Sequence, residues 1–115
     1  MDLPATRLNA EIATAPQLRP EAMVAAAAAG FRSVINNRPD FEGGADQPTS
    51  ASMEMAARAA GLEYAYLPVA GAFQTPEQAK AMAALMDSLP KPVLAFCRSG
   101  ARSGRLYELA RETRR

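Results

Sequence analysis

The fold is decided by Phe96-Cys97-Arg98-Ser99-Gly100-Ala101-Arg102-Ser103-Gly104, a stretch that contains the only cysteine of the chain. It follows a short continuous apolar run, Val93 to Phe96, which is typical of a buried parallel strand. Apolar residues then recur at helical spacing, at Leu106, Leu109 and Ala110. The pattern predicts a strand, a loop that carries Cys97, and a helix that begins near residues 101–103.

The position of Cys97 in front of a helix favours a reactive thiolate. The first backbone N–H groups of a helix lack partners within it, and its positive dipole end would face the sulfur. Such a setting lowers the pKa of a thiol from about 8.5 into roughly the 3.5–7.5 range. The same N–H groups would hold an anion beside the sulfur. The alternative is a cysteine that only packs, because free cysteine is among the most buried residue types.

The residues after Cys97 favour the functional interpretation. Arg102 offers a planar fork for oxyanions, and Gly100 allows a positive φ or a close backbone approach. Ser103 can donate a hydrogen bond to the thiolate. We therefore predict catalytic roles for Cys97 and Arg102. The predicted anion-binding residues around them are Arg98, Ser99, Gly100, Ala101 and Ser103.

Composition sets limits on the function. At 115 residues, of which 49% are hydrophobic, the chain fits one globular domain over residues 1–115. The absence of histidine excludes Ser-His-Asp and Cys-His catalysis and any His-ligated zinc site. A single cysteine excludes an internal disulfide and a Cys-rich metal site, and it indicates a reducing compartment. We therefore expect no metal and no cofactor.

Charge and hydropathy indicate neither nucleic acid nor a membrane as a partner. The formal net charge is only +1, so bulk electrostatics do not attract an anionic polymer or lipid surface. The apolar stretch from residue 22 to 29 is far too short to span a bilayer. The N-terminus lacks the basic and apolar segments of a signal peptide. We expect a cytoplasmic protein.

Apolar runs and helix signals alternate along the chain, which predicts an α/β domain with a mostly parallel sheet flanked by helices. One or two short strands are expected over 8–13, then strands over 31–36, 62–67 and 93–96. Helices are expected over 20–29, 50–60 and 75–89, with a last helix after the Cys97 loop.

Ligands of such sheets bind outside the carboxyl ends of the strands. Three loops should therefore meet at the site: residues 36–40, residues 68–74 and the Cys97 loop. Arg38 lies in the first of these loops. Two interpretations of Arg38 stay open, one in which it reaches the anion or orders the Cys97 loop, and one in which it forms an ion pair with Asp40 or Glu42.

Five segments carry a family resemblance: Val34-Ile35-Asn36-Asn37-Arg38-Pro39-Asp40, Gly61-Leu62-Glu63-Tyr64, Leu67-Pro68-Val69, Thr75-Pro76-Glu77 and Phe96 to Ser103. Together they resemble the bacterial β-lactamase hydrolase-like protein, phosphatase-like domain, a family also described as candidate sulfur transferases. The resemblance implies a fold like the dual-specificity protein tyrosine phosphatases, with Cys97 as nucleophile and Arg102 as its anion-binding partner. It also implies a place in sulfide metabolism, with a persulfide dioxygenase or a sulfide-oxidising enzyme as a partner.

Two features depart from the phosphatase pattern. Phosphatases of this fold have a histidine where Phe96 stands, and they place one residue more between the cysteine and the arginine. The four-residue spacing between Cys97 and Arg102 narrows the cradle, and it is also seen in many rhodanese-type loops. A phosphatase needs an acid for its leaving group, yet residues 68–74 contain no Asp or Glu. Asp40 is the candidate acid in their place.

We therefore predict a sulfurtransferase that moves sulfane sulfur from thiosulfate or a low-molecular-weight persulfide through a Cys97 persulfide to a thiol acceptor. Expulsion of sulfite or a thiolate needs no strong acid. The alternative is a cysteine-dependent phosphatase that acts through a Cys97 phosphoenzyme. A third option is a non-catalytic anion-binding module.

Overall fold

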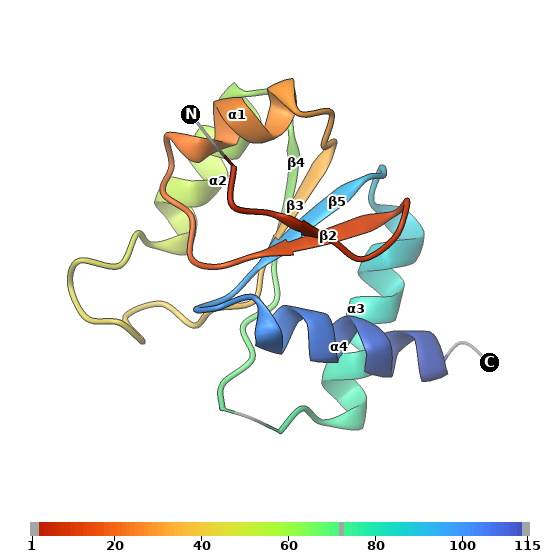
Figure 1. Ribbon diagram of the computed structural model, residues 1–115. Coiled ribbons are helices and arrows are strands. Elements are labelled where there is room, and N and C mark those ends of the chain that lie inside the picture. Colours follow the sequence, from red (N-terminus) through yellow and green to blue (C-terminus); the bar gives the residue numbers. More distant parts are fainter. Residues whose placement is uncertain (1–2, 72, 114–115) are drawn as a thin grey trace.

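The computed structural model describes residues 3–71 and 73–113, which form one sheet with two helices on each face (Figure 1). The strands are β1 (Thr6–Arg7), β2 (Ile12–Ala15), β3 (Ser33–Asn36), β4 (Glu63–Tyr66) and β5 (Val93–Phe96). The helices are α1 (Ala22–Ala28), α2 (Ser50–Ala59), α3 (Pro76–Ser88) and α4 (Ala101–Thr113).

The sheet places the strand that precedes Cys97 in its centre. The strand order is β1-β2-β5-β3-β4, and only β1 runs antiparallel to its neighbour. Phe96, the last residue of β5, lies in register with Ala15 at the end of β2 and with Asn36 at the end of β3. The chain therefore leaves β5 between the ends of two parallel strands.

Each face of the sheet is covered by one pair of helices. Helices α1 and α2 pack on the first face, while α3 and α4 cover the second (Figure 1). Residues of β5 alternate between the two cores, with Leu94 and Phe96 in the first and Val93 and Ala95 in the second. A strand buried on both faces reads as a continuous apolar run, which is why β5 has no polar alternation.

The predicted α/β class and parallel sheet are confirmed. Helices α2 and α3 begin after Thr49 and Thr75, whose side chains accept hydrogen bonds from backbone N–H groups of the first turn. Gly30 and Gly61 follow α1 and α2 with φ of 98° and 85°, as expected of residues that end helices.

The predicted bounds of the first strand were wrong. One or two short strands were expected over 8–13; the chain forms two, β1 and β2, and most of the expected range is the turn between them. The side chain of Asn9 accepts hydrogen bonds from the N–H groups of Glu11 (2.9 Å) and Ile12 (3.2 Å). Because an asparagine side chain can imitate a backbone acceptor, it stabilises a turn within a segment whose hydrophobic pattern resembles a strand.

Candidate active site

Cys97 lies directly after β5, and its side chain is buried, with only 1% of the residue exposed. The Gly100 N–H donates to Cys97 Sγ at 3.1 Å. Gly100 has a φ of 97°, and a Cβ at this position would lie 3.3 Å from the Ala15 carbonyl oxygen. A glycine is therefore needed both for the backbone conformation and for the close approach to β2.

The surroundings of Cys97 favour the thiolate. Burial alone would raise the pKa of the thiol, but backbone N–H groups of Ser103, Gly100 and Ser99 outweigh it and lower the pKa below its usual value. The Ser103 hydroxyl also faces the sulfur, yet its single hydrogen is directed at Asn37 Oδ1 at 2.8 Å. We therefore attribute the lowered pKa mainly to the backbone donors.

Asn37 connects the ends of three strands with α4, although no local sequence pattern marks it as a residue of the site. Its N–H donates to the Phe96 carbonyl at 2.8 Å, and its side-chain amide donates to the Leu67 carbonyl at 2.9 Å. Its Oδ1 accepts from the Ser103 hydroxyl of α4. Because Asn37 is fully buried, these bonds hold the ends of β3, β4 and β5 in one arrangement.

Arg102 extends from the first turn of α4 to two other loops. Its Nη1 donates to the Val69 carbonyl at 2.7 Å and to Glu42 Oε2 at 2.9 Å, and its Nη2 donates to Glu42 Oε1 at 3.1 Å. Arg38 donates from Nε to the same Oε1 at 3.0 Å and from Nη1 to Gln17 at 3.2 Å. The ion-pair interpretation of Arg38, with Glu42 as partner, is confirmed.

Glu42 is the acidic residue of the site. Its hydrogen bond from Arg102 is the main cause of a lowered pKa, and the bond from Arg38 adds to it, while partial burial opposes both. The carboxyl group is therefore ionised at neutral pH. Nothing in the local sequence around Glu42 indicates Arg102 as its partner, since the two residues lie 60 positions apart.

These side chains line a polar cavity of about 610 Å³, whose lining residues are Arg38, Glu42, Gly43, Gly71, Arg98 and Arg102. A smaller hollow of about 250 Å³ lies along Arg98, Ser99, Ala101, Arg102 and Arg105. The predicted anion-binding residues Arg98, Ser99, Ala101, Arg102 and Arg38 are thus brought together at this surface. Gly100 and Ser103 lie behind it and face the Cys97 sulfur.

Asp40, the candidate acid, is not brought to this cavity. Its Oδ1 accepts from the Ser50 N–H at 2.8 Å, and its own N–H donates to the Tyr66 hydroxyl at 2.8 Å. The carboxylate is therefore held at the start of α2. Ser99 also has a local role, because its hydroxyl accepts from the Ala101 N–H at 3.3 Å.

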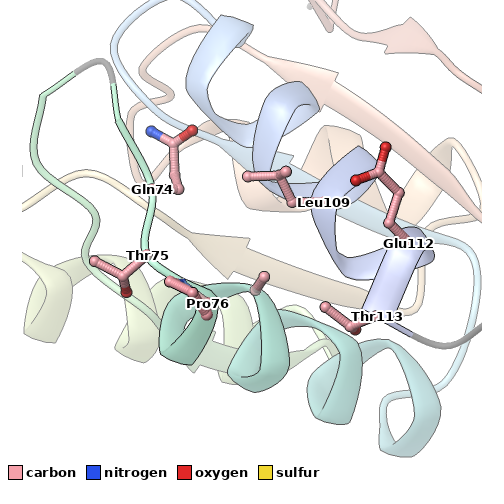
Figure 2. A pocket seen from close by; sticks show the side chains of 7 residues that line it. Gln74, Thr75, Pro76, Leu109, Glu112 and Thr113 are labelled. Atoms are coloured by element: carbon pink, nitrogen blue, oxygen red, sulfur yellow. The ribbon is translucent and has the colours of Figure 1, made fainter.

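A second pocket, of about 290 Å³, lies between α3 and α4 (Figure 2). Its lining mixes the apolar residues Pro76, Ala79 and Leu109 with the polar or charged residues Gln74, Thr75, Glu112 and Thr113, and none of these described residues lines the polar cavity. Among the described residues there is no group of three or more metal-ligating side chains. Within the same part of the chain, no helix is long and apolar enough to cross a membrane.

Comparison with known proteins agrees with this geometry. The family described as beta-lactamase hydrolase-like protein, phosphatase-like domain, matches residues 5–113. A beta-lactamase hydrolase-like protein of Agrobacterium fabrum is 36% identical over 105 residues, which cover 91% of this chain but only 24% of that protein. The chain thus spans about a quarter of the length of this curated relative.

Solved structures share the fold. A candidate phosphatase from Neisseria meningitidis is 26% identical with a TM-score of 0.87, and the match covers 98% of this chain and 80% of that one. The core catalytic domain of the S. cerevisiae PP-IP phosphatase SIW14 has a TM-score of 0.67 at 15% identity, over 89% of this chain and 60% of that one. The second likeness concerns the fold alone.

Proposed function

This chain belongs to the β-lactamase hydrolase-like protein, phosphatase-like domain family, and we propose that it is a sulfurtransferase that works through a Cys97 persulfide. The main support is a cysteine whose thiol pKa is lowered, followed in the same segment by Arg102, while the two described carboxylates nearby, Asp40 and Glu42, are held by other groups. Such a site suits a reaction whose leaving group departs as a stable anion.

The proposed reaction has two displacement steps. The Cys97 thiolate attacks the outer sulfur of thiosulfate or of a low-molecular-weight persulfide. A new S–S bond forms at Cys97, and the donor's own S–S bond breaks, so that sulfite or a thiolate leaves with the electron pair. An acceptor thiolate then attacks the terminal sulfur of the Cys97 persulfide. It takes that sulfur and releases the Cys97 thiolate.

The residues of the loop have defined tasks in this reaction. The backbone N–H of Gly100, which already donates to Sγ, stabilises the thiolate before attack and after release. Arg102 and Arg98 both line the polar cavity, which we assign to binding of the donor. Ser99 and Ala101 line the adjoining hollow.

The carboxylates near the site support sulfur transfer over phosphate ester hydrolysis. Asp40 is bound to the first N–H of α2, and Glu42 is kept ionised by two arginines. Asp40 is not among the residues that line the polar cavity, so it is not placed to reach a leaving group there. A general acid must carry a proton at the working pH, so the ionised Glu42 does not suit the protonation of an alkoxide. The short Cys97 loop suits a single sulfur atom, which lies about 2.05 Å from the cysteine sulfur in a disulfide-type bond.

A cysteine-dependent phosphatase is the second candidate, and the comparisons favour it, because the solved structures of this fold are described as phosphatases. Cys97 would then carry the phosphoryl group. The third option, a non-catalytic anion-binding module, would bind anions at the same loop without turnover.

The deciding experiment compares sulfur transfer and phosphatase turnover in one preparation. The protein is incubated with thiosulfate or glutathione persulfide, and intact mass is expected to show one added sulfur on Cys97. Hydrolysis of aryl phosphates is followed in parallel. Cys97→Ser should abolish both activities, because its hydroxyl is not ionised at neutral pH. Efficient Cys97-dependent phosphatase turnover without any persulfide would refute the proposal.

Two consequences for cell biology belong to the same proposal. A site that depends on one free thiolate works in a reducing compartment, so we place the protein in the cytoplasm. Its partners would be an enzyme that produces or consumes persulfides, such as a persulfide dioxygenase or a sulfide-oxidising enzyme.

A further inference from the structure

Glu42 occupies the end of the guanidinium fork of Arg102, which follows Cys97 by five residues in the chain. Both Nη atoms of Arg102 donate to its carboxylate, at 2.9 and 3.1 Å, and Arg38 donates to one of the same oxygens at 3.0 Å. The side chains of Glu42, Arg102 and Arg38 are 25%, 14% and 11% exposed. Water therefore screens this cluster less than it screens a pair of surface charges.

A carboxylate in this position competes with a substrate oxyanion. Guanidinium binds carboxylate, sulfate and phosphate through the same parallel pairs of N–H donors. Among the described residues, the Nε–H of Arg102 has no partner, so an anion can still approach that edge of the fork. A dianion bound there would lie close to the Glu42 charge, and like charges at such distances repel strongly at a partly buried site.

The cavity has little positive charge left for a substrate. Among the described residues that line it, three are arginines, namely Arg38, Arg98 and Arg102, and one, Glu42, is acidic. The carboxylate of Glu42 pairs with both Arg38 and Arg102, so the edges of these two guanidiniums that face Glu42 are already occupied. Within the described part of the chain, the guanidinium of Arg98 makes no hydrogen bond or ion pair. Of the three arginines that line this cavity, Arg98 is thus the one whose whole guanidinium can attract an anion.

We propose that Glu42 is a specificity-determining residue that admits substrates with at most one negative charge at the reacting end and rejects dianions. The part of this proposal that concerns the sulfur donor rests on the proposed function. Because thiosulfate is a dianion, Glu42 then selects a persulfide over thiosulfate as the sulfur donor. The thiolate of Cys97 attacks the terminal sulfur of R–S–SH. A new S–S bond forms between Cys97 Sγ and that sulfur, which gives the Cys97 persulfide, and R–S⁻ leaves with the electron pair of the broken S–S bond.

The direct test measures anion binding without turnover. Sulfate serves as the dianion and nitrate as the monoanion, and calorimetry gives their affinities for the native protein and for Glu42→Gln. We expect sulfate to bind about 10-fold more tightly to the variant, equivalent to about 1.4 kcal/mol. Nitrate should gain only about 3-fold, because it carries half the charge. Unchanged or weaker sulfate binding would overturn the proposal and leave Glu42 as a residue that only positions Arg102.

A matched control is Glu54→Gln on α2, which removes a carboxylate that pairs with Arg58 at 3.0 Å outside the site. Its sulfate affinity should equal that of the native protein. Glu42→Asp keeps the charge and should keep most of the discrimination, which separates loss of charge from local misfolding. If Glu42→Asp bound sulfate as tightly as Glu42→Gln, charge would not be the cause and the proposal would fail.

The donor prediction is tested separately with thiosulfate and glutathione persulfide. In Glu42→Gln, the ratio of the rate with thiosulfate to the rate with the persulfide should rise by about 3-fold for a singly charged persulfide end and about 10-fold for a neutral one, which follows from the different gains in affinity for dianions and monoanions. An unchanged ratio would overturn the donor assignment. If the expected change in sulfate affinity occurs while neither donor forms a Cys97 persulfide, the proposed function fails and the charge discrimination by Glu42 stands.

Discussion

Gly100→Ala tests whether the approach of Gly100 to β2 creates the reactive thiolate. Gly100 has a φ of 97°, and a Cβ there would lie 3.3 Å from the Ala15 carbonyl oxygen. The left-handed conformation costs an L-residue about 1–2 kcal/mol. The loop must also move to relieve the contact, which adds about 1–3 kcal/mol to the loss of unfolding free energy, as in an overpacked core. Part of this is offset by about 0.4–1 kcal/mol, because alanine restricts the unfolded chain.

The balance predicts a loss of roughly 2–3 kcal/mol of unfolding free energy, or about 8–12 °C in Tm for a domain of this size. Gly30→Ala is the matched control, because Gly30 has a φ of 98° but nothing within 4 Å of the added Cβ. Gly30→Ala should lose only about 1 kcal/mol of unfolding free energy. This is the cost of the left-handed conformation minus the stabilisation that alanine gives by restricting the unfolded chain.

The two variants should also differ in thiol chemistry. The Gly100 N–H donates to Cys97 Sγ at 3.1 Å, so displacement of the loop weakens a bond that lowers the pKa of Cys97. The pH midpoint of alkylation by iodoacetamide should therefore rise in Gly100→Ala and stay unchanged in Gly30→Ala. Equal stability losses and equal midpoints in both variants would refute the argument that this close approach shapes the site.

Two further predictions concern the buried network and the pH dependence of stability. Ser103→Ala leaves the Oδ1 of the buried Asn37 without its donor, so denaturant unfolding should show a loss of about 1–3 kcal/mol, and a loss below about 0.5 kcal/mol would contradict this role. The folded pKa of Cys97 is lowered, so its stabilising contribution is fully present above the unfolded thiol pKa of about 8.5 and is lost as the pH falls through the folded pKa. The unfolding free energy of the native protein, measured relative to Cys97→Ser, should therefore rise as the pH increases from the folded pKa to the unfolded pKa. A difference between the two proteins that does not depend on pH would count against a thiolate in the folded state.

Local signals explain why much of the fold could be predicted from the sequence. The strand Val93–Phe96 is a continuous apolar run, and Thr49 and Thr75 begin helices through hydrogen bonds to residues only three positions away. Short-range bonds of this kind leave a pattern in neighbouring residues. The same holds for the Cys97 loop, where the cysteine, the glycine and the arginine lie within six residues of one another.

The partners of these residues could not be predicted in the same way. Glu42 and Arg102 lie 60 positions apart, and Ser103 and Asn37 lie 66 apart, so only the strand order brings them together. Asp40 was a reasonable acid by position, because its loop follows a strand end. Its carboxylate is instead bound to the start of α2, where the N–H of Ser50 attracts an acceptor.

The width of the Cys97 cradle follows from the same strand order. Because β5 lies between β2 and β3, the loop after it contacts both neighbours: Gly100 lies against Ala15 on one side, and Ser103 bonds to Asn37 on the other. The two contacts fix the loop at both ends, so an extra residue would have to displace it from β2 or break its bond to β3. Loop length and sheet packing are thus coupled, and the width of the Cys97 loop is a property of the whole central sheet.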